Sequence, residues 1–208
     1  MALTFLKDRQ YYKFCAYGFF KNLRFFEPFL LLFFLEKGLS FLEIGTLYAI
    51  REITINLFEI PTGVLSDSLG RRRSMISAFA FYIVSFIVFF FSHQYWVFVA
   101  AILFYAYGDA FRTGTHKAMI FEYLKLKGWQ DQKVHYYGHT RSWSQMGSAL
   151  SALLAAAIVF FTGSYRMVFL FSVLPYLADL WLMTTYPREL DGQRRNLKKG
   201  EIIRNFRS

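Results

Sequence analysis

The sequence predicts an all-α integral membrane protein, a bundle of six transmembrane helices, on three observations. Hydrophobic residues make up 55% of the 208-residue chain and charged residues only 18%, whereas average globular chains carry about 25% charged residues. The apolar residues fall into blocks of about 20, the length of helix that spans a bilayer. Lysine and arginine concentrate in alternate segments between these blocks, as they do in the cytoplasmic loops of membrane proteins.

The spans follow from the apolar blocks in chain order. The first block comes after a charged start without a small-residue cleavage site, so we expect a retained helix rather than a signal peptide. Polar turns at residues 36–40, 66–73, 92–95, 124–141 and 162–166 separate the blocks, and Pro187 ends the last one. Short turns make consecutive helices antiparallel neighbours. The predicted spans are residues 14–35, 41–65, 75–91, 96–123, 142–161 and 167–186.

The basic residues predict the orientation of the bundle. Seventeen lysines and arginines lie in segments on one side, and only Lys37 and Arg166 lie on the other. By the positive-inside rule, both termini are cytoplasmic. The net charge of +10 is then a topology signal, and no nucleic-acid partner is expected. The short outside turns fit a bacterial inner (plasma) membrane, with lipid as the surrounding partner.

Two regions are predicted along the chain. Residues 1–187 form the six-helix transmembrane domain. Residues 188–208 form a basic cytoplasmic linker, in which Ile202, Ile203 and Phe206 suggest a short amphipathic helix lying on the membrane.

Several charged residues interrupt the spans, although each costs about 2.5–3.5 kcal/mol at a helix centre. On the fourth span, Tyr105, Gly108, Asp109, Arg112 and His116 follow helical spacing and form one polar stripe. We expect a water-filled cavity lined by the first, second, fourth and fifth spans, with the third and sixth outside. The candidates for substrate binding or coupling are Lys21, Arg24, Glu27, Arg51, Glu52, Asp109 and Arg112.

The alternative is that these charges only hold helices together. Asp109 could pair with Arg112 and Arg24 with Glu27, each within its own helix. For Glu59 and Asp179 we favour such a structural pair over a place in the cavity.

Enzyme chemistry and cofactors are not expected. His93 and His116 have no second metal ligand at a suitable spacing, and His135 and His139 lack an evident further ligand. The sequence shows no nucleophile beside a base and no glycine-rich phosphate loop. We therefore expect no catalytic residue, no metal and no cofactor.

The loop between the second and third spans carries a motif, Gly63-Val-Leu-Ser-Asp67-Ser-Leu-Gly70-Arg-Arg-Arg73. Gly63 would let helices approach closely, and Gly70 would allow a tight turn. Asp67 could accept hydrogen bonds from the N-terminus of a neighbouring helix and from Arg71. The motif and its place on the basic side resemble the signature of the major facilitator superfamily. The resemblance implies a gating role, latching two halves in one access state, for Gly63, Asp67, Gly70, Arg71 and Arg73.

A second segment extends the resemblance. Residues 108–123 are similar to the fourth helix of many bacterial family members, and Arg112 would match an arginine linked there to substrate or proton coupling. In this chain Gly114 follows that arginine by two positions instead of the usual four. The fifth span lacks the Gly-Pro signature of drug–proton antiporters, so the drug-efflux interpretation is less favoured.

The resemblance implies the N-terminal half of a twelve-helix secondary transporter, or permease, built from inverted three-helix repeats and working by alternating access. A second six-helix half, in the same or a separate chain, would complete it. Four cations among the candidates favour a small anionic or zwitterionic solute, with proton coupling through Glu27, Glu52 or Asp109 as an option. The alternatives are a non-transporting membrane scaffold or receptor of the same fold, and a drug/proton efflux pump.

Overall fold

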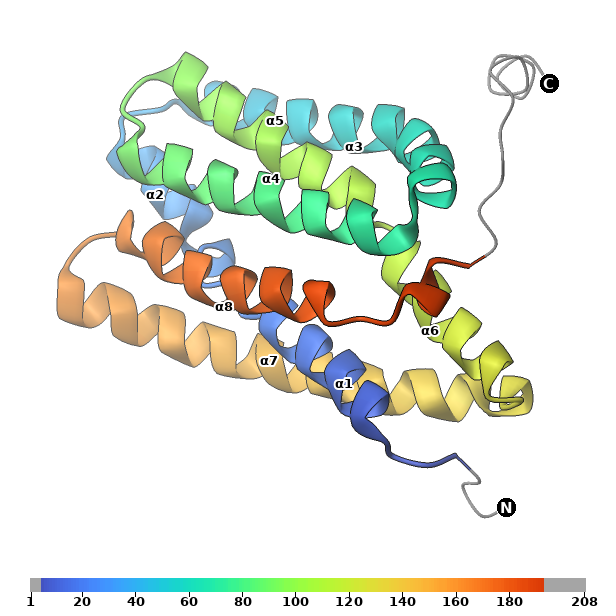
Figure 1. Ribbon diagram of the computed structural model, residues 1–208. Helices are drawn as coiled ribbons and strands as arrows, with labels where there is room; N and C mark the ends of the chain where they lie inside the picture. Colours follow the sequence, from blue (N-terminus) through green and yellow to red (C-terminus); the bar gives the residue numbers. More distant parts are fainter. Residues whose placement is uncertain (1–4, 193–208) are drawn as a thin grey trace.

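The computed structural model describes residues 5–192 and confirms the all-α fold, with no strand in this part of the chain (Figure 1). The predicted linker lies almost wholly outside the described residues. Three segments are long and apolar enough to cross a membrane: Arg71–Phe91, Gln130–Thr162 and Met167–Thr184. The helices are α1 (Arg9–Lys21), α2 (Leu30–Glu36), α3 (Phe41–Leu69), α4 (Arg71–Phe91), α5 (Tyr95–Arg112), α6 (Thr115–Leu126), α7 (Lys133–Thr162) and α8 (Met167–Thr184), with short 3₁₀ helices η1 (Glu27–Phe29), η2 (Gln130–Gln132) and η3 (Arg188–Asp191).

The helices form two groups that meet at α4 and α8. Helix α5 packs on α3 and α4, whereas α1 packs on α7 and α8. A dense aromatic core fills the junction, where the rings of Phe26, Phe33 and Phe89 all contact that of Phe169. The start of α1, the helix η3, α6 and the start of α7 all lie at one end of the bundle, called here the terminal end (Figure 1).

The first predicted span is not one continuous helix. Helix α1 ends at Lys21, where the Asn22 side-chain amide donates to the carbonyl oxygen of Gly18 at 2.7 Å. The chain resumes helical structure only at Glu27, in η1, where Pro28 occupies the first turn. Proline has no amide hydrogen and clashes with the preceding turn, which favours a break here, although α3 and α8 continue past Pro61 and Pro175.

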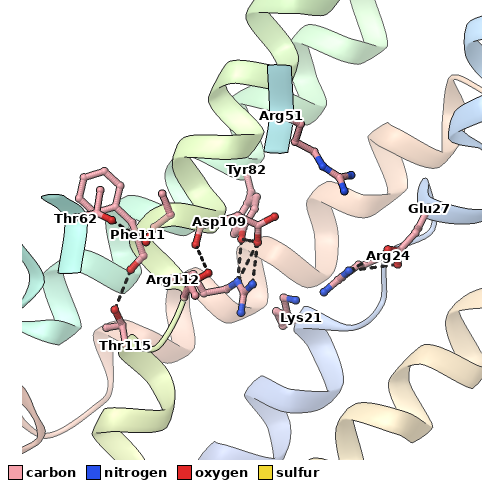
Figure 2. Close-up of polar contacts among 12 residues, drawn as sticks. Lys21, Arg24, Glu27, Arg51, Thr62, Tyr82, Asp109, Phe111, Arg112 and Thr115 are labelled. Carbon is pink, nitrogen blue, oxygen red and sulfur yellow. Dashed lines mark hydrogen bonds and ion pairs between the residues drawn. The ribbon is translucent and has the colours of Figure 1, made fainter. Parts of the chain in front are cut away.

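The fourth predicted span is also broken, between α5 and α6. Gly114 has a φ of +75°, a conformation that other residues adopt at a cost, and it ends the regular helix. The break frees backbone carbonyls inside the apolar region, where each must find a donor. The carbonyl of Asp109 still accepts from the backbone amide of Thr113 at 2.9 Å, whereas Thr62 donates to the freed carbonyl of Ala110 at 2.8 Å. Thr115 and Ser74 donate to the carbonyl of Phe111 at 3.0 and 3.1 Å (Figure 2).

Replacing Thr62 by valine is expected to destabilise the bundle by about 1–2 kcal/mol, because the Ala110 carbonyl loses its donor while the side-chain volume is kept. Thermal unfolding of the purified protein in detergent measures the effect. Thr162→Val is the matched control, since the Thr162 hydroxyl is exposed and bonds within its own helix. Equal unfolding temperatures for the two variants would contradict this explanation of the break.

Other boundaries differ from the predicted spans at the terminal end. Helix α7 begins at Lys133 instead of residue 142, and α3 and α4 run on almost to Gly70. These additional helical turns contain polar residues, which is why the apolar blocks did not predict them. The first turns of α7 pack on α1 and α6, where the ring of Tyr136 contacts those of Tyr11 and Tyr123.

Candidate functional site

A polar cavity of about 330 Å³ lies between α1, the α5–α6 break and α7, toward the terminal end of the bundle. The first, fourth and fifth predicted spans line it, as expected, but α3 contributes no lining residue, so the prediction for the second span is wrong for this cavity. Helix α3 packs mainly on α5, in the group of helices that does not include α1 and α7. The charged and polar lining residues are Lys21, Asn22, Arg24, Arg112, His116, Lys117, Thr140, Arg141 and Ser144.

Both helix breaks border the cavity. Asn22 and Arg24 come from the break in the first span, and Arg112 and Gly114 from the break in the fourth. The first and fourth spans are the corresponding members of two three-helix repeats. Paired interruptions at corresponding positions are typical of transporter binding sites, because broken backbone is tolerated where it faces a cavity.

Arg112 belongs to a hydrogen-bonded network that joins α4 and α5. Its guanidinium donates from Nη2 to Asp109 Oδ1 at 2.8 Å and from Nε to Tyr82 Oη at 2.9 Å. The Tyr82 hydroxyl donates to the same Asp109 oxygen at 2.5 Å (Figure 2). Sequence reasoning missed Tyr82 because the third span was expected outside, although it is the only tyrosine of that span. The network contains the Asp109–Arg112 pair that the alternative interpretation of the charges allowed.

The other two predicted arginines also pair with acids nearby in sequence. Arg24 contacts Glu27 at 3.0 Å, a pair that the alternative interpretation also allowed, and Arg51 contacts Glu52 at 2.7 Å. Figure 2 shows Lys21, Arg24 and Arg112 in one region, with Arg51 reaching toward it from α3.

The polar stripe predicted on the fourth span does not form. Tyr105 is buried among aromatic rings, including that of Phe26. Gly108 packs against α4, where a Cβ atom would meet the Tyr82 ring at 2.9 Å. The break then turns α6 away from the direction of α5, so only Arg112 and His116 of the stripe line the cavity.

His116 is buried and stacks on the ring of Tyr17, with 3.5 Å between the ring centroids. Its Nε2 lies 3.2 Å from the hydroxyl of Tyr186. Within residues 5–192, no three histidine, cysteine or acidic side chains gather closely enough to hold a metal ion.

Among the described residues, Glu59 and Asp179 do not form the structural pairs that were expected for them. Glu59 is exposed on α3, and its carboxylate has no ion pair within the described part of the chain. Asp179 is fully buried in α8, yet neither carboxylate oxygen has a hydrogen-bond partner there. Pairing required a donor on a facing helix at hydrogen-bond distance, and α8 meets mostly aromatic side chains at this level.

The signature loop forms a tight joint between α3 and α4. Gly70 has a φ of +101°, so its role in the turn is confirmed. Arg71 lies 3.7 Å from Asp67 and 3.8 Å from Glu122 of α6, and thereby links three helices. Gly63 has nothing within 4 Å of the position of a Cβ atom, so no close helix approach occurs there within the described structure. Arg73 is exposed.

The N-terminus of α4 is held by Asp191 of η3, and the expected acceptor Asp67 does not fill this role. The backbone amide of Arg72 donates to Asp191 Oδ1 at 2.8 Å, and the same carboxylate lies against Gly70. The Arg72 side chain donates to the carbonyls of Thr184 and Tyr186, both at 3.3 Å. Asp67 projects from the last turn of α3 and cannot reach this amide row, whereas the chain leaving α8 passes over it.

Three comparisons with known proteins give consistent matches. The family model described as Major Facilitator Superfamily matches residues 14–208. An uncharacterized MFS-type transporter, YxaM of Bacillus subtilis (strain 168), is 27% identical over 161 residues, which are 77% of this chain and 36% of that protein. Two crystal structures of the peptide transporter POT, both of a glutamate-to-glutamine mutant and one in complex with sulfate, match with TM-scores of 0.70 and 0.69 at 14% identity.

Each structural match covers 96% of this chain and 43% of the transporter chain. The chain thus spans less than half the length of the relatives it matches. The solved structures support the fold, and the family model covers nearly the whole sequence. The chain belongs to the Major Facilitator Superfamily and is an integral membrane protein.

Proposed function

We propose that this chain is the N-terminal half of a secondary transporter that moves a small anionic or zwitterionic solute by alternating access. The observation that carries the proposal is the composition of the cavity wall. Five lysines and arginines and one histidine line it, whereas no aspartate or glutamate does among the described residues. The charge of the loops supports a cytoplasmic location for both termini.

The cationic charge of the cavity is only partly neutralised. Arg24 and Arg112 have acidic partners, but Lys21, Lys117 and Arg141 have none at ion-pair distance within residues 5–192. The buried Lys21 needs a counter-charge in its low-dielectric surrounding, whereas Lys117 and Arg141 are exposed and add positive charge to the cavity wall. A carboxylate, phosphate or sulfate group of a solute would supply the counter-charge.

The start of α6 adds to the positive electrostatic potential in the cavity. Its first turn has no side-chain cap, and its residues His116 and Lys117 line the cavity. Backbone amides and the positive end of the helix dipole at such a terminus favour an anion.

The exposed face of α3 supports a second six-helix half. Glu52 and Glu59 are exposed there, beside the apolar side chains of Leu57 and Ile60. Carboxylates facing lipid are costly, so a protein partner is expected on this face. The open side of Gly63 and the exposed Asp67 and Arg73 would then meet that half, where the proposed gating latch acts.

A thermal-shift screen of the purified full-length transporter tests the solute class. We expect small anions or zwitterions to raise the unfolding temperature and organic cations to leave it unchanged, because a ligand stabilises the state that binds it. Lys117→Gln and Arg141→Gln should reduce the shift by weakening electrostatic attraction. Arg9→Gln is the matched control, since Arg9 is exposed and lies outside the cavity wall.

Each alternative predicts a different result in the same screen. Stabilisation by lipophilic cations alone would favour the drug/proton efflux pump and reject an anionic solute. No stabilisation by any class would favour the scaffold or receptor. A shift that is unchanged in both cavity variants would place the binding site elsewhere.

A further inference from the structure

A buried acid lies behind the cavity wall and takes no part in the hydrogen-bonded network described above. Asp179 of α8 is 0% exposed, and both its carboxylate oxygens lack a hydrogen-bond partner within the described structure. A carboxylate without donors in a dry surrounding costs several kcal/mol. The side chain must therefore hold a proton or draw a counter-charge close.

The basic residue that the packing of α1 on α8 brings toward Asp179 is Lys21. The two helices are held in register by the Tyr176 hydroxyl, which donates to the backbone carbonyl of Lys21 at 3.3 Å. Tyr176 and Asp179 are three residues apart, so they share a helix face. Lys21 is itself buried, and it also lines the cavity.

The remaining neighbours of Asp179 are uncharged. Tyr17 of α1 and Tyr186, just after α8, are buried titratable groups of the packed elements and are uncharged. Helix α4 carries no charged residue after Arg73, and α7 carries none after Arg141, so neither helix brings charge to this level. Lys21 in turn is within range of Arg24 and Arg112, which repel it, and of Asp109 and Glu27, which attract it.

The acids first considered for coupling are in a different situation. Glu27, Glu52 and Asp109 each contact an arginine of their own segment. Arginine stays protonated in proteins, so these carboxylates keep a permanent counter-charge. Asp179 faces a lysine that the solute can also engage.

We propose that Asp179 is the proton-binding site of the transporter and that Lys21 couples it to the solute in the cavity. The inference rests on the proposed anionic solute. When the Asp179 carboxylate is ionised, it pairs with Lys21 and withdraws that ammonium group from the cavity. When a proton from solution binds a carboxylate oxygen, the ion pair breaks, and Lys21 is released to hold the anionic group of the solute.

The cycle balances in charge and protons. One proton enters on Asp179 as one negative charge enters beside Lys21. After the access change, the proton leaves to water and Lys21 returns to the Asp179 carboxylate, which releases the solute. The cycle requires Lys21 to carry its own proton in both states.

Infrared difference spectroscopy of the full-length transporter in lipid, with pH as the only variable, tests the proton site without a solute. We expect the C=O stretching band of a buried protonated carboxyl group, lost as the pH rises. Asp179→Asn should remove this band. Lys21→Met should move its loss to higher pH by about one unit or more, because the ionised form loses its counter-charge.

Glu59→Gln is the matched control, since it removes an exposed intramembrane acid, and it should leave the band intact. A band that persists in Asp179→Asn would overturn the proposal. So would a titration that is unchanged in Lys21→Met, a variant that keeps Asp179 and stays informative if Asp179→Asn does not fold. Because no solute enters this measurement, its failure would leave the anion-binding screen standing, and the reverse also holds.

Discussion

Replacing Arg112 by alanine is expected to destabilise the bundle by about 3–5 kcal/mol, because it leaves a buried carboxylate without its cation. Asp109 is only 16% exposed, and Arg112 is its ion-pair partner within the described residues. The same change removes a donor from Tyr82, which joins α4 to α5. Thermal or denaturant unfolding in detergent measures the loss.

Two further variants separate the ion pair from general damage. Arg112→Ala combined with Asp109→Asn should recover part of the lost stability, since the unpaired charge is then gone. Arg51→Ala should change stability by less than about 1 kcal/mol, because Arg51 and Glu52 are 28% and 56% exposed. A double variant no more stable than Arg112→Ala would contradict the assignment of the cost to an unpaired Asp109.

Replacing Gly147 by alanine is expected to cost about 1–3 kcal/mol, because a methyl group there would overlap the backbone of α1. A Cβ atom at this position would collide with the carbonyl oxygen of Phe19. A backbone cannot move aside as a flexible side chain can, so α1 and α7 must separate. Since both helices line the cavity, the anion-induced thermal shift should fall as well.

Gly138→Ala is the matched control for this change. Gly138 lies in the same helix, and nothing lies within 4 Å of the position of its Cβ atom. Alanine has the higher helix propensity by about 1 kcal/mol, so this variant should be neutral or more stable. If Gly147→Ala behaved like Gly138→Ala, the close packing of α1 on α7 would be wrong.

The candidate site was predictable only where its contacts are local. Asp109 and Arg112 are three residues apart, and so are Arg24 and Glu27, so helical spacing alone predicts these pairs. Tyr82 and Asp179 lie on helices that were expected outside the cavity, in runs whose apolar neighbours hide them. Asp191 lies 119 residues from Arg72, whose backbone amide donates to it, and no local pattern could connect the two.

The sequence by itself determined the membrane class, the approximate spans, the predicted topology and the family, because hydrophobic blocks, basic loops and the motif at residues 63–73 are written along the chain. The tertiary structure decided the breaks at Asn22 and Gly114. A break in a membrane helix is tolerated only where neighbouring side chains such as Thr62 donate to the carbonyls that the break leaves free. The tertiary structure also decided that the helix of Lys21 packs on the helix of Asp179. Spacing along one helix says which residues share a face, whereas the meeting of two faces depends on how whole helices pack.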